Sequence, residues 1–229
     1  MKTDRKKTNS IKFRACIFLF AVSTLFSIQL NAQTGLTDQE KKAGEWVSSL
    51  ELKDATKEQR VAKVIADHLT IVRDWHNEHP ASTVPAGINP RTGDKLTELD
   101  RQMIADSAIP NTVHENLMNG LRADLTEEQV EAILDKYTVG KVAFTMKAYR
   151  EIVPNMTEEE DSILMANLKT AREMAVDYKS MKEISAIFEI YKTKNEQYLN
   201  NNGRSWRQMY KDYIKKLNGE KKKNEQQKN

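Results

Sequence analysis

The 229-residue sequence contains only one cysteine, Cys16. A disulfide requires two cysteines and a structural thiolate metal site requires several, so neither can form within the chain. No alternating run rich in Val, Ile and Thr lies between hairpin-turn residues, the pattern that predicts paired β-strands. The Gly-x-Ser-x-Gly, His-Glu-x-x-His and glycine-rich nucleotide-binding motifs are also missing. These absences exclude a disulfide-stabilised fold, disfavour β-structure and leave no catalytic motif.

The longest apolar run, residues 17–30, is shorter than the roughly 20 apolar residues of a membrane-spanning helix, and polar residues interrupt it. It follows a basic segment and precedes Ala32, an order typical of a secretory signal peptide. We therefore predict a signal peptide over residues 1–32, export to the periplasm or beyond, and no membrane insertion of the mature chain. Cys16 leaves with this signal, so a cysteine nucleophile is excluded as well.

The chain has a small excess of basic residues, 36 Lys and Arg against 33 Asp and Glu. Six of these bases and one acid lie in the predicted signal peptide, which leaves 30 bases and 32 acids in the mature chain. Residues 33–217 alone carry 26 bases and 30 acids. A mildly acidic body gives no support to a nucleic-acid or anionic-membrane partner, so we expect neither, and a neutral ligand is favoured.

Signals for helix starts recur along the mature chain. Five threonines stand three residues ahead of Glu, Gln or Asp, the spacing of a capping box, in which two side chains bind backbone N–H groups that the helix start leaves unpaired. Apolar residues then recur at intervals of three and four, as amphipathic helices require. We predict a single compact all-α domain over residues 33–217, with about seven or eight helices. The five threonines are Thr37, Thr56, Thr97, Thr126 and Thr157.

Two segments break this periodicity. Residues 80–93 hold three of the five prolines and two glycines, which predicts one long loop, and loops of this length in compact domains are often functional. Residues 218–229 are polar and aperiodic, which predicts a disordered tail. The Asn-Asn-Asn-Gly run at 200–203 predicts a helix end before a last short helix at 206–217.

The four histidines all lie between positions 68 and 114, on either side of the predicted loop. His76 and His79 are three residues apart, so both imidazoles can face one ligand. A zinc site needs a third ligand, for which His114, Glu78 or Asp94 are the candidates. The more ordinary interpretation is that histidines beside an apolar helix face are satisfied by hydrogen bonds, and we favour it. The sequence therefore predicts no bound metal and no cofactor.

An aromatic residue beside the loop suggests a ligand-binding site. Trp75 can stack on a sugar ring while polar side chains of the loop and its flanks bind the hydroxyl groups. The alternative is that Trp75 fills the core and that proline and Asx turns hold the loop. The candidate ligand-binding residues are Trp75, His76, Asn89, Arg91, Asp94 and His114.

Several short motifs together resemble segments of a known family. The motifs are Asp74-Trp75-His76, residues 84–90 with Thr92-Gly93, Leu99-Asp100-Arg101-Gln102, Val113-His114-Glu115, Gly140-Lys141-Val142 with Phe144-Thr145, and Ile152-Val153-Pro154-Asn155. They are similar to segments of secreted proteins from polysaccharide-degrading Bacteroidetes that are grouped as domain of unknown function 3826, and the resemblance covers about residues 36–203. It implies secretion, an all-α fold and a sugar-binding role, but it supplies no catalytic motif.

Three hypotheses for function follow. The leading one is a secreted accessory protein that binds a glycan or glycan fragment and has no catalytic activity. The second is a glycan-active hydrolase or lyase in which His76 or His114 acts as base with Asp94 or Asp100, because histidine exchanges protons near neutral pH. The third, from the charge-rich helix faces and the methionines, is a periplasmic helical chaperone or scaffold.

Overall fold

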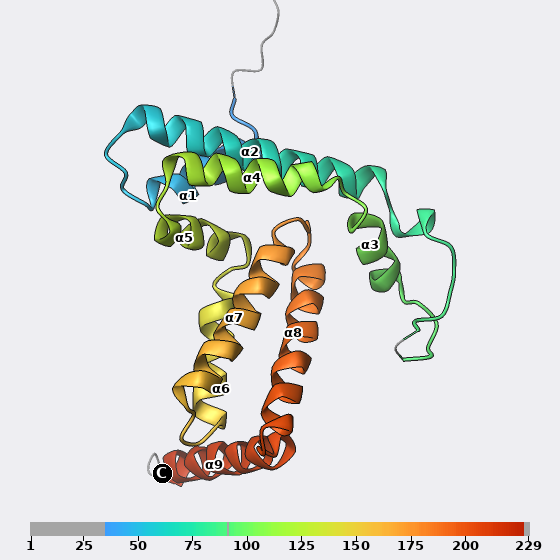
Figure 1. Cartoon of the computed structure of the whole chain (residues 1–229), viewed down its shortest axis with the longest axis vertical. Helices are drawn as coiled ribbons and strands as arrows, with labels where there is room; N and C mark the ends of the chain where they lie inside the picture. The colour runs from blue at the N-terminus through green and yellow to red at the C-terminus, as the bar shows by residue number, and fades with distance from the viewer. Residues whose placement is uncertain (1–34, 91, 227–229) are drawn as a thin grey trace, which may run out of the picture. The chain divides into compact units, whose positions relative to one another are not determined.

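The computed structural model describes residues 35–90 and 92–226, with the side chains of 221–226 left out (Figure 1). The predicted signal peptide and Arg91 lie outside the described residues. In this part of the chain the secondary structure consists of nine α-helices, one 3₁₀ helix and one isolated β-bridge between Ile88 and Lys95. The helices are α1 (Asp38–Ser48), α2 (Ala55–Glu78), η1 (Ala81–Thr83), α3 (Glu98–Asp106), α4 (Asn111–Asp124), α5 (Glu127–Tyr137), α6 (Lys141–Ile152), α7 (Glu158–Ala175), α8 (Met181–Asn201) and α9 (Trp206–Gln226).

The all-α prediction is confirmed, and residues from Thr37 onward form one compact unit. The number of helices exceeds the predicted seven or eight because α4 went unrecognised. This helix begins after Pro110 without a side-chain cap, so the capping signal that marks other helix starts is missing there. No helix within the described part is both long enough and apolar enough to cross a membrane.

Most of the predicted caps begin a helix. Four of the five threonines form a complete capping box, the exception being Thr56. At that helix Asp54 is the N-cap and its carboxylate accepts from the Lys57 N–H, so α2 begins before Thr56. Ser180 and Glu183 form a further capping box at the start of α8 that the threonine pattern did not include.

The C-terminal prediction needs a correction. Helix α8 ends as predicted, with Gly203 in the left-handed conformation just beyond it at φ 81°. Helix α9 then runs to Gln226, so residues 218–226 are helical where we predicted disorder. A polar, aperiodic sequence need not prevent a helix from continuing once packing has nucleated its first turns, because each further residue adds a backbone hydrogen bond.

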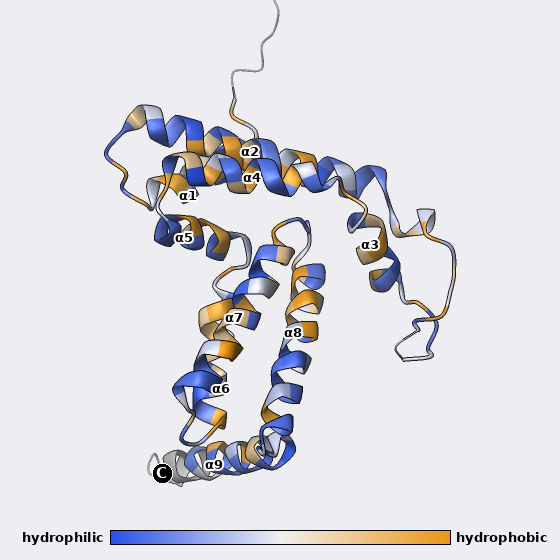
Figure 2. Ribbon diagram, in the orientation of Figure 1, coloured by the Kyte–Doolittle hydropathy of each residue, from blue (hydrophilic) through white to orange (hydrophobic). Residues whose placement is uncertain are grey.

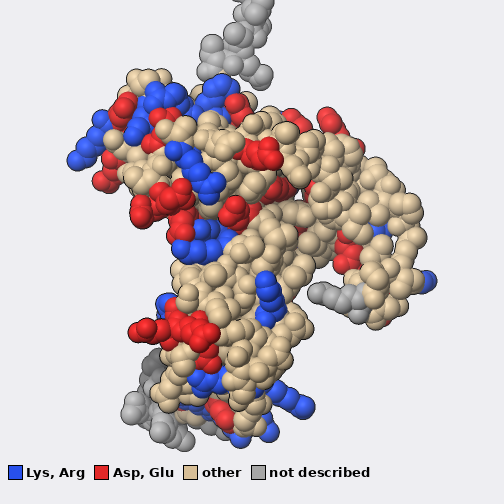
Figure 3. Space-filling model, in the orientation of Figure 1, with Lys and Arg blue, Asp and Glu red and all other residues tan. Residues whose placement is uncertain are grey.

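Two apolar clusters hold the helices together. One joins α1, α2, α4 and α5 around Ile65, Leu121 and Ile133, and the other joins α6, α7 and α8 around Met146, Leu164 and Leu168. Figure 2 shows orange and blue residues on each of α2, α5, α7 and α8, as expected of helices that bury one face. On the face drawn in Figure 3, Lys and Arg are intermingled with Asp and Glu over the α2 and α4 region.

Helix α2 and the turn between α7 and α8 bring together the side chains that matter for the site. His68, Trp75, His76 and His79 lie along α2 or at its end. Asp177 and Tyr178 lie in the turn, residues 176–180, which connects α7 to the cap of α8. Hydrogen bonds from His68 on α2 and His114 on α4 to Asp177 fix this turn against both helices.

Candidate functional site

A pocket of about 580 Å³ lies where the α3–α4 connection meets the end of α7. This volume falls within the roughly 300–1,000 Å³ range of small-molecule sites. Four carboxylates, one histidine and several hydroxyl and amide groups line it, and its described lining includes no Lys or Arg. The polar and charged lining residues are Asp106, Ser107, Asn111, His114, Glu115, Thr170, Glu173, Asp177 and Tyr178.

Two residues of the lining, His114 and Asp177, belong to a histidine–aspartate–histidine chain that continues behind the pocket to His68. The Asp177 carboxylate lies 2.9 Å from His114 Nδ1 through Oδ2 and 3.0 Å from His68 Nε2 through Oδ1. Behind it, the Tyr137 hydroxyl lies 3.2 Å from His68 Nδ1. His68 is buried with its ring satisfied on both nitrogens, as the ordinary interpretation of the histidines predicted. His114 is half-buried, and its Nε2 lies 3.6 Å from a Glu173 carboxylate oxygen.

The hydrogen bonds between Asp177 and the two histidines favour the ionised forms of Asp177 and His114. The hydrogen bond to Asp177 raises the pKa of His114 against the opposing effect of partial burial, and Glu173 raises it further. Burial by itself raises the pKa of Asp177, but the hydrogen bonds from His114 and His68 together outweigh it and leave that pKa below its usual value. The imidazole of His114 therefore holds its proton to a higher pH than a free histidine does.

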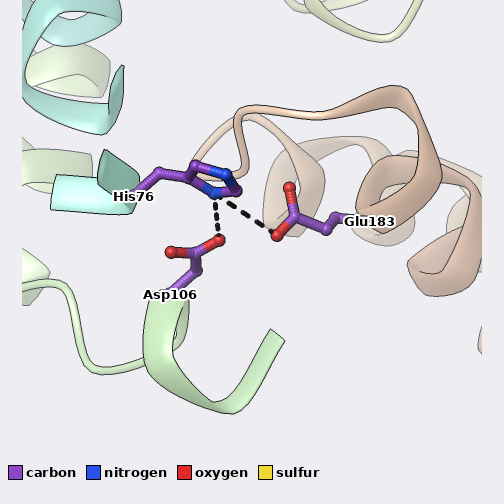
Figure 4. A group of neighbouring side chains, drawn as sticks. All are labelled: His76, Asp106 and Glu183. Carbon is purple, nitrogen blue, oxygen red and sulfur yellow. Dashed lines mark hydrogen bonds and ion pairs between the residues drawn. The ribbon is translucent and has the colours of Figure 1, made fainter. Parts of the chain in front are cut away.

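A second cluster lies beside this pocket, formed by His76 on α2, Asp106 at the end of α3 and Glu183 on α8 (Figure 4). His76 Nδ1 lies 2.7 Å from Asp106 Oδ2 and 3.6 Å from Glu183 Oε1. Figure 4 shows both carboxylates directed at the same ring nitrogen. The side chains of Asp106 and Glu183 are 3% and 1% exposed, whereas that of His76 is 22% exposed, so two buried acids face a half-buried imidazole.

Neighbouring groups orient the second cluster. The Gln102 side-chain amide donates to Asp106 Oδ1 at 3.0 Å, and the Ser180 backbone N–H donates to Glu183 Oε2 at 2.9 Å. Glu183 Oε1 is buried without a hydrogen-bond partner among the described residues. Burial raises the pKa of Glu183, and the adjacent Asp106 carboxylate raises it further.

Tyr178 lies close to the acids of both clusters. Burial raises the pKa of its phenol, and the negative charges of Asp106, Glu183 and Asp177 add to this effect. The phenol therefore stays protonated and can donate a hydrogen bond into the pocket that it lines. The acids of the two clusters are thus close enough to act on the same phenol.

The six sequence-predicted ligand-binding residues do not form one site. His114 lines the pocket, whereas His76 belongs to the adjoining cluster. The Trp75 indole is half-buried, donates to the Ala105 carbonyl at 3.1 Å and stacks on His79 with the ring centroids 3.9 Å apart. One face of that indole is thus occupied by the protein itself.

The remaining predicted residues lie elsewhere. Asn89 borders a different groove, of about 690 Å³, between the loop, α3 and α8. Asp94 is exposed, and backbone hydrogen bonds within the loop join it to Asn89 (Asn89 N–H to Asp94 O, 2.8 Å). Arg91 lies outside the described residues. The long loop therefore does border a groove, but not the one that contains His114.

Sequence reasoning missed the acids that partner the histidines. Asp177 and Glu183 follow the last predicted loop residue by more than 80 positions, and nothing in the sequence around Asp177 separates it from the other acids of the chain. Asp106 was likewise not among the predicted site residues. A usable signal was present at Glu183, since the Ser180-x-x-Glu183 spacing is that of a capping box.

A larger hollow, of about 990 Å³, lies between α1, α2, α5 and the start of α8. Its described lining contains no histidine and is mostly apolar, with scattered Lys, Arg and Asp. Although it is larger, its described charged residues are of both signs and include no histidine–carboxylate pair. We therefore place the candidate site at the smaller pocket, where the polar chemistry is concentrated.

The fold and these contacts define an all-α protein with two histidine–carboxylate clusters at a junction of helices. The chain belongs to the family described as "Protein of unknown function (DUF3826)", which matches residues 36–219. This confirms the family part of the sequence resemblance. A search of curated proteins found no match. The family description names no activity, so the chemistry of the site carries the functional argument.

Proposed function

We propose that this protein binds a neutral glycan or glycan fragment in the pocket lined by His114, Asp177 and Glu173. The observation that carries the proposal is the composition of the lining, which has four carboxylates and, among the described residues, no Lys or Arg. Such a lining repels anionic ligands such as uronates and phosphates. It suits a ligand that offers many hydroxyl donors, because each carboxylate oxygen accepts hydrogen bonds.

The rest of the lining fits the same ligand class. Ser107, Asn111 and Thr170 offer further donors and acceptors, while Ile109 and Met174 supply apolar contact. Carbohydrate rings present polar edges and apolar C–H faces, so a mixed lining of this kind matches both. Export through the predicted signal peptide and an accessory role in polysaccharide use remain parts of this proposal, since residues 1–32 lie outside the described residues.

Titration calorimetry on the mature chain tests this function. The ligands are neutral gluco-, manno-, xylo- and galacto-oligosaccharides, and the comparison set is uronic-acid oligosaccharides of matched length. We expect a neutral ligand to bind and Glu173→Gln to weaken it by roughly tenfold or more, since a hydrogen bond to a charged group contributes about 1.5–3 kcal/mol. Glu189→Gln, an acid of the groove beside Asn89, is the matched control and should bind normally.

Three results would contradict the proposal: no binding of any neutral saccharide, a preference for uronates, or equal affinity in the Glu173 and Glu189 variants. Suppression of client-protein aggregation with no response to sugars would instead support the chaperone or scaffold alternative. If Trp75→Ala lowers the saccharide affinity and Glu173→Gln does not, the binding site is the one predicted from sequence, at Trp75 and the long loop.

A catalytic function is the second candidate, and one observation favours it. Asp177 holds His114 through Nδ1, which directs Nε2 toward the pocket and Glu173. A carboxylate that orients an imidazole in this way is the arrangement of a general acid or base. Here the acid partner is Asp177 rather than the Asp94 or Asp100 named from sequence.

Product release distinguishes catalysis from binding alone. A hydrolase or lyase should release reducing or unsaturated ends from a polysaccharide mixture, and His114→Gln should abolish the release while His79→Gln leaves it intact. Saccharide binding by the wild-type protein without any product would exclude catalysis on that ligand and leave the accessory role.

A further inference from the structure

We propose that His76, Asp106 and Glu183 bind one divalent transition-metal cation of the Zn²⁺ class. This site goes beyond the saccharide pocket and does not depend on it. It also departs from the sequence-based expectation of no metal, which considered His76 only with His79, Glu78, Asp94 or His114. The ring of His79 is instead stacked on Trp75, while two acids from distant helices face His76.

The geometry of the three side chains suits one ion. One atom from each, the His76 Nδ1 and a carboxylate oxygen from each acid, lies within 4.8 Å of the other two. Zinc bonds of about 2.0–2.2 Å separate ligand atoms by roughly 3–3.5 Å. The observed separations from His76 Nδ1, 2.7 Å and 3.6 Å, lie on either side of that range, so small side-chain rotations are enough to admit the ion.

Glu183 provides an independent observation that something is to be bound. Its side chain is 1% exposed, and its Oε2 is held by the cap of α8. Its Oε1 lies 3.6 Å from His76 Nδ1, an ion-pair distance too long for a hydrogen bond, and has no hydrogen-bond partner in the described part of the chain. A buried carboxylate oxygen without a hydrogen-bond partner is destabilising, because burial removes the water that would otherwise bind it. Coordination to a cation removes this cost, and native proteins leave few such atoms unsatisfied.

The charge balance supports a dication. Asp106 and Glu183 form ion pairs with His76 alone among the described residues, and no Lys or Arg pairs with either acid. When both acids are ionised, two buried carboxylates beside one imidazole have excess negative charge, and buried charges are stable only when they are paired or bind a metal. One M²⁺ ion with a neutral imidazole neutralises both acids.

The surroundings match those of known metal sites. Gln102 fixes Asp106 by a hydrogen bond, the α8 cap fixes Glu183, and α2 fixes His76, so three helices hold the ligands. Asp106 also lines the pocket that contains His114, which gives an ion a route from solvent. Imidazole combined with two carboxylates favours Zn²⁺, Co²⁺ or Mn²⁺ over Mg²⁺ and Ca²⁺, which prefer all-oxygen ligation.

Metal titration of chelator-stripped, mature protein tests the site. Calorimetry with Zn²⁺, Co²⁺, Mn²⁺ and Mg²⁺ should show one ion per chain and a preference for Zn²⁺ or Co²⁺ over Mg²⁺. Glu183→Gln and His76→Gln should each weaken Zn²⁺ binding by at least about 100-fold, and Gln102→Ala by roughly 10-fold or more, as expected for a group that orients a ligand.

The matched controls are Glu160→Gln and His79→Gln. Glu160 occupies the same position in the capping box of α7 as Glu183 does in that of α8, and it is likewise buried. His79 follows His76 at the end of the same helix. Both controls should bind Zn²⁺ like the wild type. Absence of Zn²⁺ and Co²⁺ binding, or binding that survives in both Glu183→Gln and His76→Gln, overturns the site in favour of a carboxyl pair that shares a proton.

A measurement on the wild type covers the case in which the ligand variants fail to fold. Co²⁺-loaded protein should show visible d–d absorption and one paramagnetically shifted imidazole signal, and the signal should persist in His79→Gln. A Co²⁺ complex without a shifted imidazole overturns the assignment.

Discussion

Asp177 is the residue whose replacement tests the site architecture most directly. Its two carboxylate oxygens hold His68 and His114, from two different helices, against the α7–α8 turn. Asp177→Asn keeps the shape of the side chain and removes its charge. Each hydrogen bond to a charged group contributes about 1.5–3 kcal/mol, and the amide oxygen can still accept one of the two. We therefore expect a loss of about 2–4 kcal/mol in the free energy of unfolding.

The assay is denaturant and thermal unfolding followed by circular dichroism. For a domain of this size about 1 kcal/mol lowers Tm by roughly 2–4 °C, so the expected decrease is about 5–15 °C. Asp161→Asn is the matched control, because Asp161 lies on α7 and pairs with Arg150 at the surface, where both side chains are at least a third exposed. An exposed ion pair contributes about 0–1 kcal/mol, so this variant should differ little from the wild type.

The pH dependence of the difference between wild type and Asp177→Asn gives a sharper test. The folded pKa of Asp177 is depressed, so its contribution is present above the unfolded value near 4 and is lost as the pH falls through the lower folded value. The folded pKa of His114 is raised, so its contribution is complete below about 6.5 and is lost as the pH rises through the folded value. The difference should therefore be largest between about pH 4 and 6.5. A difference that grows above pH 7, or one no larger than that of Asp161→Asn, would refute the reasoning.

Two further predictions concern packing and acid stability. A methyl group at Gly120 would lie 2.7 Å from Val64 Cγ1, whereas one at Gly44 meets nothing within 4 Å. Overpacking costs about 1–3 kcal/mol and alanine gains about 1 kcal/mol in helix propensity, so by denaturant unfolding Gly120→Ala should lose up to about 2 kcal/mol while Gly44→Ala gains about 0.5–1. Equal effects would contradict this account of the α2–α4 contact. The Arg204 hydrogen bonds lower the pKa of Glu160 to about 2, so this pair should stabilise the fold above the unfolded value near 4.3 and less as the pH falls toward 2. Arg204→Gln should flatten the acid limb of a stability–pH curve, and an unchanged limb would show that the pair contributes nothing.

Local sequence signals account for most of the helix starts. Thr37, Thr97, Thr126 and Thr157 each begin a helix because a capping box involves residues only three apart, and such contacts form within one turn. The same reasoning missed α4, which begins after Pro110 without a side-chain cap. It also placed one cap at Thr56 although Asp54 satisfies the first turn of α2.

The sequence predicted the histidines of the candidate site but not the acids that partner them. The sequence drew attention to His76 and His114 as the residue types that exchange protons near neutral pH, and it favoured hydrogen-bonded partners over a metal. Their partners could not be chosen, because the chain is rich in acids and a helical periodicity does not say which acid faces which histidine. His76 and Glu183 are 107 positions apart, and only the packing of α2, α3 and α8 brings them together.

The sequence by itself determined the all-α class and the starts of several helices, because capping and amphipathic periodicity are local properties of the chain. The tertiary structure decided where the chemistry lies. Docking the α7–α8 turn against α2 and α4 placed Asp177 between two histidines, and packing of α8 against α3 buried Glu183 beside Asp106. Both arrangements depend on contacts between residues far apart in the chain, which local periodicity cannot specify.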